Sequence, residues 1–215
     1  MLVISDTHTN FKYLIDAINH TSEKNIILLG DHGFGEDGNY GVFSTDVLYS
    51  LVENAGKHIY CIAGNHDNQS HMDDIYGLNY IHCIRTSNGP KVYTIEDKQC
   101  LFVPGAYSFD KQLQIAQNSW YENEEMAYVM MRDFEDTYVF LRHQIEYLFS
   151  HDTSINNYEY LYHETTPSFT NQFMYHLYTM SNKCIPKIHG HLHIPYYDYD
   201  KNVIGLGINQ SMLLK

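Results

Sequence analysis

Side chains that can bind metal ions or transfer protons follow five apolar, strand-like runs of the sequence. They are carboxylates, one amide and imidazoles: Asp6, His8, Asp31, Asn65, His66, Asp67, His163, His191 and His193. Chance readily places one such residue after a strand, but packing gains nothing from imidazoles crowded at one edge of a sheet. The repeated pattern therefore predicts that these residues share one functional site.

The mixture of oxygen and nitrogen donors predicts a site for divalent metal ions. Such a set suits manganese, iron, zinc, cobalt or nickel, and it includes none of the four cysteines. Seven of these residues are potential ligands, too many for one tetrahedral zinc ion but enough for two neighbouring ions that one carboxylate bridges. A pair of ions about 3.5–4 Å apart holds a phosphoryl group and converts a bridging water to hydroxide near neutral pH. The ligand set therefore predicts a dinuclear site that hydrolyses phosphate esters.

Strands and helices are predicted to alternate over residues 1–67. The predicted strands are Leu2–Ser5, Asn25–Asp31 and His58–Ala63, and apolar residues at helical spacing predict helices over residues 10–22 and about 44–54. This order is typical of a parallel sheet covered by helices. The ligands of such sheets gather beyond the carboxyl ends of the strands, which is where the candidate residues stand.

The pattern changes from about residue 80, where short runs with turn signals predict antiparallel strands. "SNGP" (87–90) and "EDKQ" (96–99) are predicted tight turns, and residues 122–150 are predicted to be mostly helical, with a break near Thr137. The runs 158–167 and 185–193 are predicted strands that end in polar clusters, and 201–209 is predicted as the last strand. No repeat or linker is visible in the sequence, so residues 1–215 are predicted to form a single domain.

Composition argues against several classes of protein. The formal net charge of −13 disfavours binding to extended nucleic acid, because that affinity comes largely from Lys and Arg. The sequence has no run of about 18 or more apolar residues, so no membrane span is expected. The cysteines form no CxxC pair, and the chain starts with a strand-like run rather than a signal peptide, so reduced thiols and a cytoplasmic location are expected.

The candidate residues form the ordered motifs D-x-H, G-D, G-N-H-D, H and G-H-x-H, from Asp6 to His193. This order resembles the signature of the calcineurin-like metallophosphoesterases. The resemblance implies an α/β fold with four layers, an α/β/β/α sandwich of two mixed sheets. The stretch "GAYSFDK" (105–111), followed by Trp120 and Glu122, is similar to one in small bacterial and phage members, so the expected location becomes the host cytoplasm if a phage encodes the chain.

The resemblance also implies a role for each candidate residue. The implied ligands are Asp6, His8 and His193 for the first metal ion, Asn65, His163 and His191 for the second, and Asp31 as the bridge between them. His66 would stabilise the transition state or protonate the leaving oxygen rather than bind metal. The implied cofactor is two divalent metal ions, with manganese favoured and iron, zinc, nickel or cobalt as alternatives.

Three of the residues named for the site have alternative interpretations. His151 in "LFSHDTS" competes with His163, which is favoured because it follows a β-like run and precedes a proline, whereas His151 ends a helix-like run. Asp67 would either orient a neighbouring residue by hydrogen bonding or cap the following turn. His32 would either contact substrate or pack in the interior.

The favoured function is that of a phosphodiesterase or phosphatase in which a metal-bridging hydroxide attacks the phosphorus of a small-molecule or nucleotide ester. A protein Ser/Thr phosphatase is disfavoured because Phe34 and Gly35 stand where that branch has Asp and Arg. A nuclease is disfavoured because no basic groove is visible in the sequence. A non-catalytic scaffold on the same fold is disfavoured because every ligand position holds a competent residue. The oligomeric state and the physiological substrate are left open.

Overall fold

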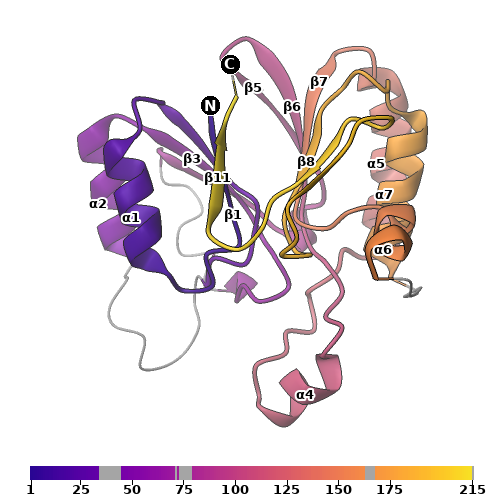
Figure 1. The fold of residues 1–215 in the computed structure, drawn as a ribbon, viewed down its shortest axis with the longest axis horizontal. Helices are drawn as coiled ribbons and strands as arrows, with labels where there is room; N and C mark the ends of the chain where they lie inside the picture. The colour runs from indigo at the N-terminus through magenta and orange to yellow at the C-terminus, as the bar shows by residue number, and fades with distance from the viewer. Residues whose placement is uncertain (34–44, 71, 73–78, 163–167, 215) are drawn as a thin grey trace.

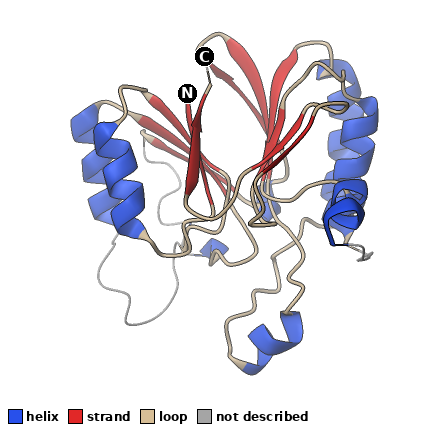
Figure 2. Ribbon diagram, in the orientation of Figure 1, coloured by secondary structure: helices blue, strands red, loops and turns tan. Residues whose placement is uncertain are grey.

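Two β-sheets face each other in the computed structural model, which describes residues 1–33, 45–70, 72, 79–162 and 168–214 (Figures 1 and 2). Helices lie on the outer face of each sheet, so the layers run α/β/β/α (Figure 1). The expected four-layer α/β arrangement of two mixed sheets is therefore confirmed. No helix among the described residues is both long enough and apolar enough to cross a membrane.

The first sheet combines strands from the first half of the chain with the last strand. Its order is β11 (Gln210–Leu213), β1 (Leu2–Ser5), β2 (Asn25–Leu28), β3 (His58–Ile62) and β4 (Ile81–Ile84). Strands β1 to β4 are parallel, and β11 pairs antiparallel with β1. Helices α1 (Phe11–His20) and α2 (Thr45–Ala55) cover the outer face, as the predicted alternation requires (Figure 1).

The second sheet comes from the rest of the chain. Its order is β5 (Lys91–Ile95), β6 (Lys98–Val103), β7 (Ile145–Ser150), β8 (Lys187–His189), β10 (Val203–Gly205) and β9 (Tyr196–Asp198). The four central strands are parallel, and β5 and β9 pair antiparallel at the two edges. Its outer helices are α5 (Tyr128–Leu141), α6 (Ile155–Tyr162) and α7 (Phe169–Met180). Between β6 and α5, an arm that carries α4 (Lys111–Ala116) extends away from the sheets (Figure 1).

Strand β1 shows how the core is divided. Alternate side chains of a strand point to opposite faces of its sheet, so Leu2 and Ile4 pack toward α1 and α2, whereas Val3 packs between the two sheets. Phe102 of β6 and Phe149 of β7 fill the same inter-sheet layer from the opposite side. Because both of their faces are covered, most of the central strands are mainly apolar and carry polar residues at their ends.

Residues 122–150 do not form one helical segment, which corrects the prediction. Helix α5 ends at Leu141, and Ile145–Ser150 form β7 between β6 and β8. The apolar residues of β7 lack the alternation of a half-buried strand because β7 is covered on both faces. Residues 155–162 show the opposite difference from the prediction, a helix in place of part of a predicted strand. They include most of a tyrosine-rich run whose intrinsic propensity favours a strand, but they form α6.

The two predicted turns have different outcomes. "EDKQ" is the hairpin turn between β5 and β6, with Glu96 and Asp97 at φ angles of 52° and 63°. "SNGP" instead lies in the connection from β4 in the first sheet to β5 in the second. The two strands that flank it therefore do not pair with each other, and β4 pairs in parallel with β3. Strand β9 was not predicted, and β11 follows the run that was predicted to be the last strand.

Candidate metal centre

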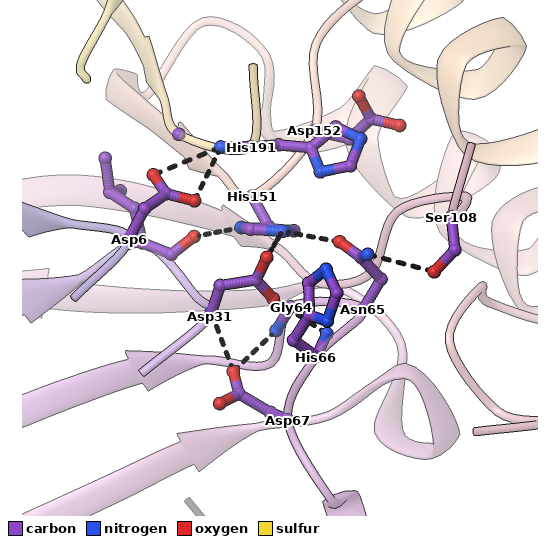
Figure 3. A network of polar contacts seen from close by, with 12 residues as sticks. Asp6, Asp31, Gly64, Asn65, His66, Asp67, Ser108, His151, Asp152 and His191 are labelled. Atoms are coloured by element: carbon purple, nitrogen blue, oxygen red, sulfur yellow. Dashed lines mark hydrogen bonds and ion pairs between the residues drawn. The ribbon is translucent and has the colours of Figure 1, made fainter. Parts of the chain in front are cut away.

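The candidate residues that the structure describes follow the carboxyl ends of parallel strands in both sheets, and Figure 3 shows several of them. The strands and the residues after them are β1 with Asp6 and His8, β2 with Asp31, β3 with Asn65, His66 and Asp67, β7 with His151, and β8 with His191 and His193. The loops of the two sheets are joined where the backbone N–H of His191 donates to the Asp6 carboxylate, at 3.0 and 3.2 Å. The expected meeting of these residues at one edge is therefore observed for all that the structure describes.

The backbone of this site is strained. Asp6, His8, Asp31, His191 and His193 have positive φ angles between 40° and 63°. Non-glycine residues rarely adopt this left-handed region, and they cluster at functional sites when they do. Five such residues at one edge of the sheets are an indication of function that is independent of residue type.

Asp6, His8, Asp31 and His193 form the first donor cluster. One oxygen or nitrogen atom of each lies within 4.8 Å of those of the others. His193 Nε2 lies 2.8 Å from His8 Nε2 and 3.6 Å from Asp6 Oδ1. Burial lowers the pKa of His8, which favours the neutral imidazole that binds metal. Nitrogen and oxygen donors thus converge on one point, as the ligands of a divalent cation do.

Asp31, His151 and His191 form the second donor cluster, whose ligand atoms also lie within 4.8 Å of one another. His151 Nε2 lies 3.3 Å from Asp31 Oδ2 and 3.0 Å from Asn65 Oδ1 (Figure 3). His191 Nε2 is buried and has no hydrogen-bond partner among the described residues. Such a nitrogen is costly unless another group, such as a metal ion, lies beside it. Because Asp31 belongs to both clusters, its carboxylate is the candidate bridge.

The structure brings His151 into this second cluster, whereas His163 lies outside the described residues. The reason for favouring His163 was wrong, because helix α6 precedes it and strand β7 precedes His151. His151 Nδ1 donates to the carbonyl of Leu29 at 2.7 Å, so Nε2 is the nitrogen left to bind metal. The signal that could have found His151 is "EYLFSHD", an apolar run that ends in His and Asp like the other motifs.

The pKa shifts of Asp31 and His151 favour opposite charges on the two side chains. Burial raises the pKa of Asp31, but the surrounding imidazoles, His151 first, lower it by more and hold it well below its usual value. Burial lowers the pKa of His151, but the carboxylates of Asp31 and Asp6 raise it to about 10. A divalent cation held by His151 would take the place of its proton, since metal ligands must be deprotonated. The donor set therefore fits a divalent cation.

The Asp67 carboxylate holds together the loops that follow β2 and β3 (Figure 3). It accepts hydrogen bonds of 2.9–3.0 Å from the backbone N–H groups of Asp31, His32, Gly33 and Gly64. Burial and the Asp31 carboxylate raise the pKa of Asp67 to about 6, and these N–H donors oppose the shift. Gly64 has no room for a side chain, because a Cβ there would collide with Asp31. Of the two expected roles of Asp67, these contacts favour orientation of its neighbours.

His66 and His32 belong to neither cluster among the described residues. The backbone N–H of His66 donates to Asp31 Oδ1 at 2.8 Å, and its partly exposed ring lies 5.4 Å from the ring of His8. A proton donor for a leaving group must stand at such an edge of the site. His32 is buried with its Nδ1 2.9 Å from Thr7 Oγ1, and burial lowers its pKa to about 4. These contacts favour the interior role of His32.

Two residues that sequence reasoning missed lie next to Asn65. Asn65 Nδ2 donates to Ser108 Oγ at 3.0 Å, and Ser108 Oγ donates to Glu124 Oε2 at 2.6 Å. Ser108 and Glu124 are buried, and both come from the arm that carries α4. No local pattern marks this contact, because it depends on how the arm folds back against the end of β3.

Comparison with known protein families agrees with this geometry. A family model described as calcineurin-like phosphoesterase matches residues 1–195. The chain belongs to the calcineurin-like phosphoesterase family. It is therefore a metallophosphoesterase, a phosphoric ester hydrolase of a metal-dependent family, and its His and Asp clusters are candidate ligand sets.

Solved structures share the fold of the phosphoesterase at low sequence identity. A dimetal phosphatase from Danio rerio has a TM-score of 0.58 and 11% identity, over 97% of the phosphoesterase and 88% of that chain. A "Putative 5′-Nucleotidase" from Staphylococcus aureus has a TM-score of 0.56 and 15% identity, over 97% of the phosphoesterase and 48% of that chain. The phosphoesterase thus spans about half the length of the Staphylococcus aureus protein. A comparison with curated protein sequences finds no match.

Proposed function

We propose that the phosphoesterase hydrolyses phosphate esters with two divalent metal ions that Asp31 bridges. The proposed ligands are Asp6, His8 and His193 for the first ion, and Asn65, His151 and His191 for the second. His151 thus takes the role that the sequence assigned to His163. The observation that supports the proposal most strongly is that Asp31 belongs to both donor clusters, within 4.8 Å of the other ligand atoms in each.

The chemistry would be divided between the ions and the chain. The two ions would supply an activated water as nucleophile and offset the charge that develops on the phosphoryl group. His66, whose ring lies beside His8, would donate a proton to the leaving oxygen or stabilise the transition state. Asp67 would hold the loops of Asp31 and Gly64 in place. Manganese is the proposed ion, and iron, zinc, nickel and cobalt suit the same donors.

A small phosphate ester or a nucleotide is the proposed substrate, as a monoester or a diester. The net charge of −13 repels a long polyanion, which argues against a nuclease. Phe34 and Gly35, on which the case against a protein phosphatase depends, lie outside the described residues. The proposed location is the cytoplasm, because Cys61, Cys83 and Cys100 are buried free thiols, as is usual in a reducing compartment.

Hydrolysis of model esters tests this function. Metal-stripped protein is resupplied with manganese, nickel, zinc or magnesium and assayed with bis-p-nitrophenyl phosphate and p-nitrophenyl phosphate. Metal-dependent turnover that Asp31→Asn abolishes is the expected result, and the preferred substrate distinguishes a phosphodiesterase from a phosphatase. Two bound ions without turnover of either ester would instead support the scaffold alternative.

A further inference from the structure

We infer that Ser108 and Glu124 set the orientation of the Asn65 side-chain amide, so that its oxygen faces the second cation. The inference rests on the proposed function, because it requires Asn65 to bind metal. Ser108 and Glu124 are positioning residues in this account, since they act through Asn65 and do not touch the substrate.

The two ends of an asparagine amide have opposite chemistry. The oxygen accepts hydrogen bonds and binds cations, whereas the NH₂ group only donates. Asn65 Oδ1 lies 3.0 Å from His151 Nε2, on the side of the second donor cluster, and Nδ2 points to Ser108. A rotation of the amide by half a turn would aim NH₂ at the cation. With a cation bound, His151 Nε2 would carry no proton to hold the Asn65 oxygen, so the group that contacts the Nδ2 end decides whether Asn65 can be a ligand.

A serine hydroxyl alone does not impose one orientation, because it both donates and accepts. Glu124 removes the ambiguity. Its carboxylate accepts the single hydroxyl proton of Ser108 over 2.6 Å, a short charge-assisted hydrogen bond, whereas Gln114 Oε1 lies 3.4 Å from the same oxygen. The Ser108 oxygen is then left to accept, and only the NH₂ end of Asn65 can donate to it.

The arm that supplies this pair is tied to the first sheet at both ends. The backbone N–H of Gly105 donates to the carbonyl of Ala63 at 2.8 Å. The carbonyl of Asn123 accepts from Thr86 Oγ1 at 2.7 Å and from Gln69 Nε2 at 2.8 Å. These contacts fix the start and the end of the arm, and so they fix the distance between Ser108 and the site.

Glu124→Gln tests the inference with little change in shape. The new amide can donate to Ser108 Oγ, which frees the hydroxyl proton to point at Asn65 and favours the reversed amide, with Oδ1 toward Ser108. Glu125→Gln is the matched control, because Glu125 Oε1 also accepts from a serine hydroxyl, that of Ser168 at 2.6 Å, away from Asn65. Both variants lose one negative charge at neighbouring positions.

Calorimetric titration of metal-stripped protein with Mn²⁺ is the first measurement. Glu124→Gln is expected to weaken one of the two binding events, that of the ion held by Asn65, by about 10–100-fold, as is usual when a residue that orients a metal ligand is lost, and to leave the other unchanged. Glu125→Gln is expected to match the wild type. Ser108→Ala should weaken the same event, and combining it with Glu124→Gln should add little, because both act through one hydrogen-bond chain.

Two results would overturn the inference. One is that both binding events in Glu124→Gln, or in Ser108→Ala if the former variant does not fold, equal those in Glu125→Gln. The other comes from metal-free protein, where NMR follows hydrogen exchange of the Asn65 side-chain NH₂. Exchange should be faster in Glu124→Gln than in Glu125→Gln, and equal rates contradict the inference. If the wild type itself takes up fewer than two ions, the proposed function fails, and the NMR result then decides only whether Ser108 and Glu124 orient the Asn65 amide.

Discussion

Asp31 is held from several sides, and this is why one carboxylate reaches both donor clusters. Its backbone N–H donates to Asp67, its Oδ1 accepts from the backbone N–H of His66, and its Oδ2 lies 3.3 Å from His151 Nε2. The residue also has a positive φ of 53°, which few residues adopt without such support. A carboxylate fixed in this way cannot turn toward one cation and leave the other, which is what a bridging ligand requires.

Replacing His151 tests which histidine belongs to the site. His151→Ala removes the nitrogen next to Asp31 and Asn65, and we expect it to lose the second ion and to lower kcat/KM by roughly 100-fold or more. His163→Ala is the control and should keep two ions, with activity within about two-fold of the wild type. Metal analysis after dialysis and hydrolysis of bis-p-nitrophenyl phosphate measure both quantities. The reverse pattern would return the ligand role to His163.

His66→Ala separates proton donation from metal binding. The variant should keep both ions, because the His66 ring belongs to neither cluster, and its kcat should fall by about 10²–10⁴-fold. The loss should be larger for an alkyl ester than for a p-nitrophenyl ester, since p-nitrophenolate leaves without a proton. Steady-state kinetics on the two esters provide the comparison. Equal losses on both would exclude His66 as the donor to the leaving group.

The sequence predicts much of the site because the signals for its residues are local. Asp6, Asp31 and Asn65 each stand within three residues of the end of a buried strand, and that position alone brings them to one edge of a sheet. Ser108 and Glu124 could not be predicted in the same way. Their role depends on a contact between the arm and the end of β3, which no periodicity or spacing encodes.

At the scale of elements, β7 shows where pattern reasoning fails and why this affects function. Its apolar residues face α-helices on one side and the first sheet on the other, so they show no alternation and continue the helical spacing of α5. Assigning β7 to a helix hid His151, which directly follows the strand. The run 158–162 led to the opposite error, because tyrosines favour strands by propensity but these residues belong to α6.

Strand β8 contains a buried ammonium group that makes stability depend on pH. Lys187 Nζ donates to the carbonyls of Ile185 and Lys201, each at 3.0 Å, and burial lowers the pKa of Lys187 from 10.5 to about 8. Between these two values the unfolded chain holds a proton that the native protein has released, so the free energy of unfolding rises with pH across this window. The rise is about 1.4 kcal/mol for each pH unit.

Lys187→Met should lack this rise, because methionine carries no titratable group. Urea unfolding measures the free energy of unfolding of the wild type and of Lys187→Met at pH values below about 8 and between about 8 and 10.5. The difference between the two proteins isolates the contribution of Lys187, since all other groups titrate in both. The free energy of unfolding of the wild type is expected to rise relative to that of Lys187→Met as pH increases from about 8. Parallel pH dependences of the two proteins would show that the ammonium group keeps its usual pKa when buried.

At the scale of the whole molecule, the proposed cations join the two sheets. The first ion would contact Asp6 and His8 from the first sheet and His193 from the second, and the second ion would contact residues from both sheets as well. The first sheet and its helices were predictable because the strand and helix order of residues 1–67 was clear, whereas the four-layer arrangement was implied by the resemblance to the metallophosphoesterases. The pairing of the second sheet was not, since its strands come from distant parts of the chain.

Metal removal should therefore destabilise the phosphoesterase as a whole. A ligand that binds only the folded state at about 100 times its Kd adds about 2.7 kcal/mol for each site. For a chain of this size that corresponds to a rise in Tm of roughly 5–10 °C per site. Thermal unfolding in a chelator and in excess Mn²⁺ measures the shift, with Asp31→Asn as the control that should show a smaller one. A Tm that does not respond to Mn²⁺ would contradict binding between the sheets.

Electron paramagnetic resonance of the Mn²⁺-loaded protein tests the central claim most directly, because two ions that share a bridging ligand are magnetically coupled. Metal-stripped phosphoesterase is titrated with Mn²⁺ while the spectrum is recorded. We predict that the wild type binds two ions per chain and gives the spectrum of a coupled pair. In Asp31→Asn, we predict the spectrum of isolated ions or the binding of only one ion. One ion per chain, or two ions without coupling, would contradict a dinuclear site bridged by Asp31.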